Sequence, residues 1–214
     1  MILFIKDTIR MVAKVIAFPI SYYFVRGIQI ILIYITSEYI FKLFKKCGKR
    51  PVIYFPASVK GGKYITVGDN FNVSSGLRIE AIDRYFNDSF IPKITIGNNV
   101  FIGQNCHIGC INSVDIGNNV LIASNVYITD HFHGNIDALS LNIPPAQRKI
   151  VSKGSIVIED NVWIGERVSI MPNIHIGVNS IVGANSVVTK NIPANCVVGG
   201  VPARIIRYLI EENN

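Results

Sequence analysis

Two histidines that can do proton chemistry stand beside an aspartate in the stretch ITDHFHGNID, where His131 and His133 follow Asp130. Imidazole has an ordinary pKa of about 6.5, so it can accept a proton near neutral pH and act as a general base. In an extended segment, residues two apart face the same side. This would direct both histidines into one cleft and the Asp130 side chain away from that of His131. The alternatives are that His131 is a solvated loop residue and that His133 only caps the loop.

The residues on both sides of this stretch repeat with a period of six, and glycine often follows the repeated aliphatic residue. The aliphatic residues form three runs with this spacing: Ile96, Ile102 and Ile108, then Ile116, Ile122 and Ile128, and then Ile158, Ile164, Ile170, Ile176, Val182 and Val188. A helix cannot keep this period on one face, because its own period is 3.6 residues, whereas short strands joined by tight turns can. We therefore predict a parallel β-helix with the aliphatic side chains inside. The period does not fix its handedness, and general connection rules favour right-handed crossovers.

The repeat stops after Ile128 and resumes at Ile156 and Ile158. A long excursion from a compact domain is usually functional or disordered. This predicts a protruding arm over residues 131–155, with His131 at the point where the arm leaves the coil.

Composition and charge leave several classes of function open. The chain has 214 residues, half of them apolar, which predicts one main domain, and its net charge of +7 suits phosphorylated ligands, nucleic acid or an anionic membrane alike. The four cysteines lack paired spacing, and no cleavable signal is recognisable, so we expect reduced thiols and a cytoplasmic protein. Cys106 falls at an inward position, which disfavours metal binding by CHIGC, and no metal is expected.

Residues 1–50 are apolar and basic, and we expect them to form a helical segment. Their basic cluster is Lys42, Lys45, Lys46, Lys49 and Arg50. A spanning helix needs about 20 mostly uncharged residues, the uncharged runs here are shorter, and Pro19 would end or kink a helix. One or two helices lying on a membrane surface fit this pattern, and so does packing against the rest of the protein or a neighbouring subunit. A span stays open because residues 27–37 are almost wholly apolar.

Four features together resemble the hexapeptide-repeat acetyltransferases, most closely the bacterial O-acetyltransferases of polysaccharide and lipopolysaccharide biosynthesis and the galactoside and maltose acetyltransferases. They are the hexapeptide runs, the break at TDHFHG, the motif NVWIG at 161–165 and the terminal VVTKNIPANCVVGGVPARIIR at 187–207. The resemblance implies an all-β fold, a left-handed parallel β-helix over residues 51–203, and a homotrimer with active sites between subunits. It implies transfer of an acetyl group from acetyl-CoA to a sugar hydroxyl of a cell-surface glycan or its precursor, and no nucleic-acid partner. The N-terminal segment favours a lipid-linked acceptor.

The resemblance also assigns roles to residues. His131 takes the place of the catalytic base, in a direct transfer without an acyl-enzyme, and His133 would assist it or bind the acceptor. Trp163 would help to form the pantetheine channel. The other donor positions are Gly183, Ala184, Thr189 and Lys190, toward the pantetheine and adenine, and Arg204 and Arg207, near the phosphates. The alternative for the two arginines is a solvated terminal helix.

Acceptor contacts are less clearly matched. Sugar acetyltransferases carry an asparagine at the level of GQNCHIG, but Gly103 stands at that position here, with Asn105 two residues on. This departure leaves the acceptor open. His107 should face outward beside inward Cys106, and Arg78 could contact a sugar or pair with its neighbour Glu80 along a strand. Residues 204–214 are expected to form a short helix that covers the open end of the core.

Other functions share these repeats. An O-acetyltransferase of xenobiotics such as antibiotics would use the same coils, and a non-catalytic scaffold would need none of the residues above. A zinc carbonic anhydrase needs three converging imidazoles, and the histidine spacing here does not match that family. The candidates for such a site would be His107, His131, His133 and His175.

Overall fold

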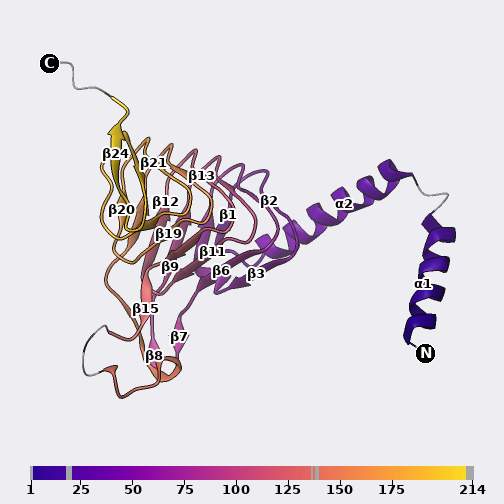
Figure 1. Ribbon diagram of the computed structural model, residues 1–214, viewed down its shortest axis with the longest axis horizontal. Helices are drawn as coiled ribbons and strands as arrows, with labels where there is room; N and C mark the ends of the chain where they lie inside the picture. Colours follow the sequence, from indigo (N-terminus) through magenta and orange to yellow (C-terminus); the bar gives the residue numbers. More distant parts are fainter. Residues whose placement is uncertain (1, 18–20, 136, 138–139, 211–214) are drawn as a thin grey trace.

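The structure is a computed structural model that describes residues 2–17, 21–135, 137 and 140–210. A stack of short coils forms the body of the protein, and α2 (Tyr22–Phe41) extends from one end of it, while the C-terminal strand lies at the other end (Figure 1). A second helix, α1 (Ile2–Ala17), precedes α2, so the predicted N-terminal helical segment is confirmed.

The coils have three faces, each a sheet of strands from successive coils. The β1 face contains, in spatial order, β1 (Lys46–Cys47), β4 (Ile65–Val67), β9 (Lys93–Ile96), β12 (Ser113–Ile116), β17 (Ile156–Ile158) and β20 (His175–Ile176). The β2 face contains β2 (Val52–Ile53), β5 (Asn72–Val73), β10 (Phe101–Ile102), β13 (Leu121–Ile122), β18 (Trp163–Ile164), β21 (Ile181–Val182), β23 (Cys196–Gly199) and β24 (Arg204–Tyr208). The β3 face contains β22 (Val187–Val188), β19 (Ser169–Ile170), β14 (Tyr127–Thr129), β11 (His107–Cys110), β6 (Leu77–Ala81) and β3 (Ala57–Lys60). Short 3-10 helices lie at Gly62–Tyr64 and Pro145–Gln147.

The core is made of the aliphatic residues that recur with the period of six. On the β1 face, Ile96, Ile116, Ile158 and Ile176 lie opposite one another in consecutive parallel strands, and each is at most 3% exposed. Stacking therefore buries a continuous column of branched side chains, which favour strands. The predicted parallel β-helix is confirmed.

Asparagines hold the corners between the faces. Asn99, Asn119, Asn161 and Asn179 all have φ between 56° and 60°, in the left-handed region that asparagine tolerates better than most residues. Their side chains form a ladder, in which each amide donates to the oxygen of the next at 3.0 to 3.1 Å. The Gly-Asn turn signals in the sequence thus serve both backbone conformation and contact between coils.

The C-terminal part of α2 caps the first coil. Phe41 is buried, and its ring centroid lies 6.5 Å from that of Phe71. Ser37 Oγ donates to the carbonyl of Ile53 at 3.0 Å and accepts from its amide at 2.9 Å. Packing of the β-helix therefore begins within α2, before residue 51, because an open end of a solenoid exposes its core.

The opposite end is capped in a different way from the one we expected. The predicted helix over residues 204–214 is wrong: β24 (Arg204–Tyr208) is a strand that pairs antiparallel with β23. Gly200, with φ of 101°, turns the chain back, and the edge of β23 offers backbone groups that need partners. A short apolar run such as IIRYLI fits both a helix and a strand. Residues 211–214 lie outside the described residues.

Candidate functional site

The arm predicted from the break in the repeat is a hairpin of β15 (His131–His133) and β16 (Ile150–Ser152), which pair antiparallel. A second hairpin, formed by β7 (Arg84–Tyr85) and β8 (Asp88–Ser89), follows β6 in the chain and was not predicted. Its signal in the sequence is a polar interruption, DRYFNDS, between two repeat positions. Sequence reasoning missed it because the interruption is short enough to be a corner.

The two hairpins contact each other through polar side chains. Lys149 Nζ lies 3.1 Å from Asp88 Oδ1, and Tyr85 Oη lies 3.5 Å from His133 Nδ1. His133 also meets the Tyr85 ring edge-on, with centroids 5.8 Å apart. The hairpins together form one wall over the outer side of the β3 face.

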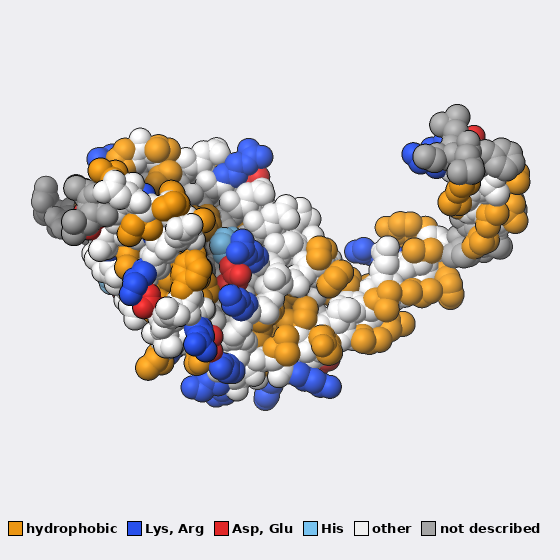
Figure 2. Space-filling view, turned by 90° about the horizontal axis from the view of Figure 1, so that it is seen from below, with side chains coloured by type: hydrophobic (Ala, Val, Ile, Leu, Met, Phe, Trp, Pro, Cys, Tyr) orange, Lys and Arg blue, Asp and Glu red, His pale blue; other side chains and the backbone are white. Residues whose placement is uncertain are grey.

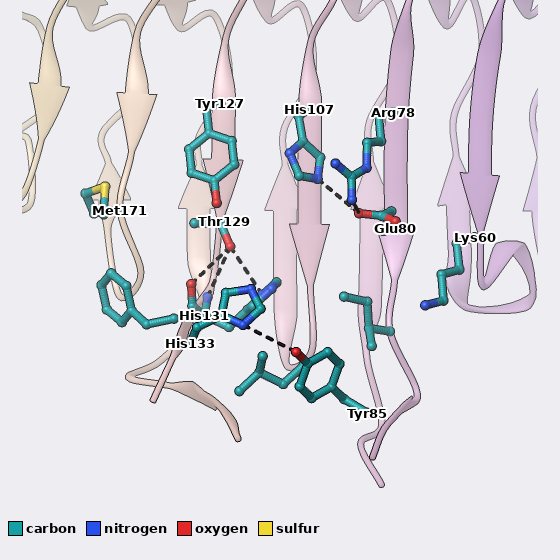
Figure 3. Close-up of a pocket in the computed structure, with 13 residues that line it drawn as sticks. Lys60, Arg78, Glu80, Tyr85, His107, Tyr127, Thr129, His131, His133 and Met171 are labelled. Carbon is teal, nitrogen blue, oxygen red and sulfur yellow. Dashed lines mark hydrogen bonds and ion pairs between the residues drawn. The ribbon is translucent and has the colours of Figure 1, made fainter. Parts of the chain in front are cut away.

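A cavity of about 410 Å³ lies between this wall and the β3 face (Figure 3). Its lining residues are Lys60, Arg78, Glu80, Ile82, Tyr85, His107, Tyr127, Thr129, His131, Phe132, His133, Ile150 and Met171. Four of the predicted site residues thus converge here, namely Arg78, His107, His131 and His133. Lys60, Tyr85, Tyr127 and Thr129 were missed, because only the stacking of coils shows which outward residues share a face.

His131 is held by the preceding residue. Its Nδ1 lies 3.0 Å from Asp130 Oδ1, and Asp130 is fully buried. The Asp130 carboxylate also accepts hydrogen bonds from the amides of Ile111, at 2.9 Å, and Asn112, at 2.7 Å. We predicted that the Asp130 side chain would point away from His131, and this is wrong. The chain leaves the coil at this point, so the regular alternation of a strand does not apply.

These contacts select one form of the imidazole. A carboxylate can only accept, so the hydrogen bond to Asp130 requires the proton on Nδ1 and leaves Nε2 with a free lone pair. Thr129 Oγ1 lies 3.2 Å from the same Nδ1 and donates to the His131 carbonyl at 3.2 Å. The His131 side chain is 11% exposed and lines the cavity. An imidazole held in this way can accept a proton at Nε2, as a general base does.

Gly109 makes space for the imidazole. It lies on β11 between Glu80 and Thr129 of the neighbouring strands, and a Cβ built on it would lie 3.1 Å from His131 Cε1. Such a distance is tighter than usual van der Waals contact. Glycine at this position therefore lets the His131 imidazole approach the β3 face this closely.

A charged cluster lies beside His131 along the β3 face. Glu80 Oε2 is 2.7 Å from Arg78 Nη2 and 3.2 Å from His107 Nε2 (Figure 3). Burial lowers the pKa of His107 below its usual 6.5, and the charge of Arg78 lowers it further, although the hydrogen bond to Glu80 acts in the opposite direction. His107 is therefore neutral at neutral pH and donates to Glu80. The ion pair expected as an alternative for Arg78 is present, within the cavity.

Asn105 lies elsewhere. It occupies a corner with φ of 54°, is exposed, and donates its backbone amide to the Ser75 carbonyl at 3.0 Å. The residues that line the cavity do not include it. In this chain Asn105 serves the turn before β11.

The predicted donor residues are outside the cavity as well. Trp163 lies on the β2 face and is 49% exposed. It stands in one row with Ile181, Val197 and Arg207 of the next three strands. Of the remaining positions, the exposed ones are Ala184, Thr189, Lys190 and Arg204, and Gly183 is half-buried. The row spans about 14 Å at the usual strand spacing, and it gives an elongated ligand an apolar surface that ends at a cation.

Metal binding has no support in the described part of the chain, where no three His, Cys, Asp or Glu side chains come together in a group that could hold a metal ion. His175 pairs with Glu159 Oε1 at 2.7 Å on the β1 face, away from the other histidines. Burial raises the pKa of the Cys110 thiol, and the nearby Asp130 raises it further.

Comparison with known proteins agrees with this architecture. Residues 93–130 match the family model described as the hexapeptide repeat of succinyl-transferase, and residues 155–190 match that of the bacterial transferase hexapeptide. The chain is 42% identical, over 165 residues, to the putative lipopolysaccharide biosynthesis O-acetyl transferase WbbJ of Escherichia coli (strain K12), covering 75% of this chain and 80% of that protein.

Two solved structures are also similar. AntD, an N-acyltransferase from Bacillus cereus in complex with dTDP and 3-hydroxybutyryl-CoA, has a TM-score of 0.66 at 22% identity, covering 81% of this chain and 87% of its own. A hexapeptide-repeat acetyltransferase from Vibrio cholerae O1 biovar eltor, complexed with acetyl-CoA, has a TM-score of 0.53 at 28% identity, covering 80% of this chain and 75% of its own.

Proposed function

We propose that this chain, which belongs to the hexapeptide-repeat acyltransferases and shares their left-handed β-helix, moves an acetyl group from acetyl-CoA to a sugar hydroxyl. The acceptor would be a cell-surface glycan or its precursor. The observation that carries the proposal is the His131 imidazole, oriented by buried Asp130 at one side of a polar cavity. The names of the E. coli relative and of the acetyl-CoA complex support the choice of acceptor and donor.

In this mechanism His131 activates the hydroxyl. Nε2 takes the hydroxyl proton as the oxygen attacks the thioester carbonyl, and a tetrahedral intermediate forms. The intermediate then collapses and the carbon–sulfur bond breaks. The imidazolium returns its proton to the sulfur, so coenzyme A leaves as the thiol. Asp130 stabilises the imidazolium between the two proton transfers, because its carboxylate lies 3.0 Å from Nδ1 in a buried position. No acyl-enzyme is needed.

The acceptor would lie along the β3 face. Glu80 can accept from sugar hydroxyls, and Arg78 holds Glu80 in place at 2.7 Å. Tyr85 and Phe132 of the two hairpins, together with Tyr127, offer ring surfaces on which the apolar face of a sugar can pack. The cavity thus combines the carboxylate of Glu80 and the cations Lys60 and Arg78 with aromatic walls, which suits a polyhydroxyl ligand.

The donor would need a second chain. The row from Trp163 to Arg207 lies on the β2 face, whereas His131 lies over the β3 face, so one chain does not bring them together. A homotrimer would place the β2 face of one subunit against the His131 cavity of its neighbour. The Trp163 row would then hold pantetheine, with Arg204 and Arg207 near the phosphates.

The test is mass spectrometry of the surface glycan from a strain that lacks the gene, compared with its parent and with a strain complemented by His131→Ala. We expect O-acetyl groups on the glycan of the parent, none in the strain that lacks the gene, and strongly reduced acetylation in the strain with His131→Ala. An identical glycan in all three strains would rule out this acceptor, and release of thiol from acetyl-CoA by the purified protein with other hydroxyl compounds would then identify the acceptor class.

A further inference from the structure

α2 carries large apolar side chains that the protein does not cover. The exposed ones are Tyr22, Tyr23, Phe24, Val25, Ile28, Ile30, Ile31, Leu32, Tyr34, Ile35 and Tyr39. Over an 18-residue window the helix has a mean hydropathy of 1.4, and the protein buries only 17% of that window. Figure 2 shows this apolar surface along the helix where it extends from the coils. Single exposed apolar residues are common on protein surfaces, but a contiguous apolar patch of this extent marks a surface that contacts a membrane or another protein.

The attachment of α2 limits what that phase can be. Ser37 and Phe41 are fixed on the first coil, which leaves residues 22–36 free. Fifteen helical residues span about 22 Å, whereas the hydrocarbon core of a bilayer is about 30 Å thick. Arg26 shortens the uncharged part further. By composition α2 could cross a membrane, but its free part is too short to do so.

The charges around α2 complement an anionic surface. The cluster directly after it is Lys42, Lys45, Lys46, Lys49 and Arg50, and all five are exposed. Lys6, Arg10 and Lys14 follow one another four residues apart on α1, which places them on one side of that helix, and they are exposed too. Juxtamembrane cations each add about 1 kcal/mol of attraction to anionic lipid.

We propose that α2 and the basic cluster at 42–50 dock this protein on an anionic lipid bilayer, with the apolar side chains of α2 inserted and without crossing it. The surface continues onto the first coil, where Phe55 is 66% exposed beside an apolar groove that Leu43 and Val59 also line. Strand β3 contributes Val59 to this groove and Lys60 to the His131 cavity. Docking would therefore hold the cavity beside the membrane surface. The proposal does not depend on the acetyl transfer proposed above.

The experiment uses the full-length protein with vesicles of phosphatidylcholine alone or mixed with phosphatidylglycerol, in a co-sedimentation assay at low and high salt. We expect binding to the anionic vesicles that weakens at high salt. Ile31→Glu with Ile35→Glu should weaken it roughly a hundredfold or more, because carboxylates replace two exposed apolar side chains that would insert into the bilayer. Ile91→Glu, at an 89% exposed position outside α2, is the matched control and should bind as before.

Two further measurements distinguish the proposed docking from a helix that crosses the membrane and from a helix that packs against a second copy of the chain. A protease-cleavable tag before Met1 should stay accessible from outside sealed vesicles, and protection of the tag would show a crossing helix and overturn the proposal. Light scattering reports whether the α2 variant changes the oligomer. If the unaltered protein ignores anionic vesicles while the variant falls apart into smaller species, α2 packs against a second copy of the chain and the proposal is wrong.

Discussion

Asp130 and His131 are neighbours in the chain whose side chains also meet, with Oδ1 and Nδ1 3.0 Å apart. In a regular strand they would point to opposite sides. The contact exists because the chain leaves the coil here, and the two amides of Ile111 and Asn112 hold the carboxylate from the neighbouring coil. The predictions below begin from this pair.

His131→Ala should lower the rate of acetyl transfer by about two to four orders of magnitude, the usual contribution of a positioned general base. The rate is measured as thiol released from acetyl-CoA with the acceptor glycan. His175→Ala, which removes an exposed histidine of the β1 face, is the control and should keep its rate. A near-normal rate for the first variant would refute the assignment of the base.

Asp130→Asn should lower kcat while leaving the KM for acetyl-CoA unchanged. An amide can donate to Nδ1 and so favours the tautomer with the proton on Nε2, a change that costs about 10⁴ in a serine-protease triad. Thr129 Oγ1 also contacts Nδ1, so we expect a loss of roughly 10² to 10⁴. The thermal midpoint shows whether the variant is folded. A folded variant with normal kcat would mean that Asp130 only holds the Ile111 and Asn112 amides.

Gly109→Val should reduce kcat by up to about a hundredfold, because a displacement of the reacting group by about 1 Å has an effect of this size. Even a Cβ at this position would lie 3.1 Å from His131 Cε1. Gly27→Ala is the control, since a Cβ on Gly27 meets nothing within 4 Å. Equal activity of both variants would show that the imidazole has room to move.

Arg204→Ala with Arg207→Ala should weaken coenzyme A binding by about 1 to 3 kcal/mol, as expected for charged hydrogen bonds to phosphate. Dephospho-coenzyme A should be affected less, and calorimetry with both ligands measures the difference. Equal weakening for the two would place the phosphate contact elsewhere. Both arginines lie on β24, so circular dichroism should confirm that the strand cap persists.

The free energy of unfolding should fall as the pH drops below about 6.5, in part because of His107. Its pKa is lowered in the folded protein, by burial first and by Arg78 second, so the unfolded chain binds more protons in this range. His107→Asn should make the dependence shallower by at most about 1.4 kcal/mol per pH unit. Denaturant titrations at several pH values measure this slope. An unchanged slope would show that the lowered pKa of His107 contributes nothing to acid sensitivity.

The sequence by itself determined the coils of this protein. The six-residue spacing of Ile158, Ile164 and Ile170 follows from the alternation of side chains along a strand and from the conformations that glycine and asparagine permit at corners, which are local properties. The break after Ile128 marked the arm for the same reason, because an interrupted period is visible without any partner.

Only the tertiary structure decided which groups become partners where the chain departs from the repeat. Asp130 turns toward His131 because the amides that hold it belong to the neighbouring coil, and Glu80 reaches His107 because their strands lie side by side. The final segment became β24 because the edge of β23 was unpaired, although its residues also fit a helix. Each of these outcomes depends on hydrogen bonds between residues far apart in the chain, and a one-dimensional period carries no information about such partners.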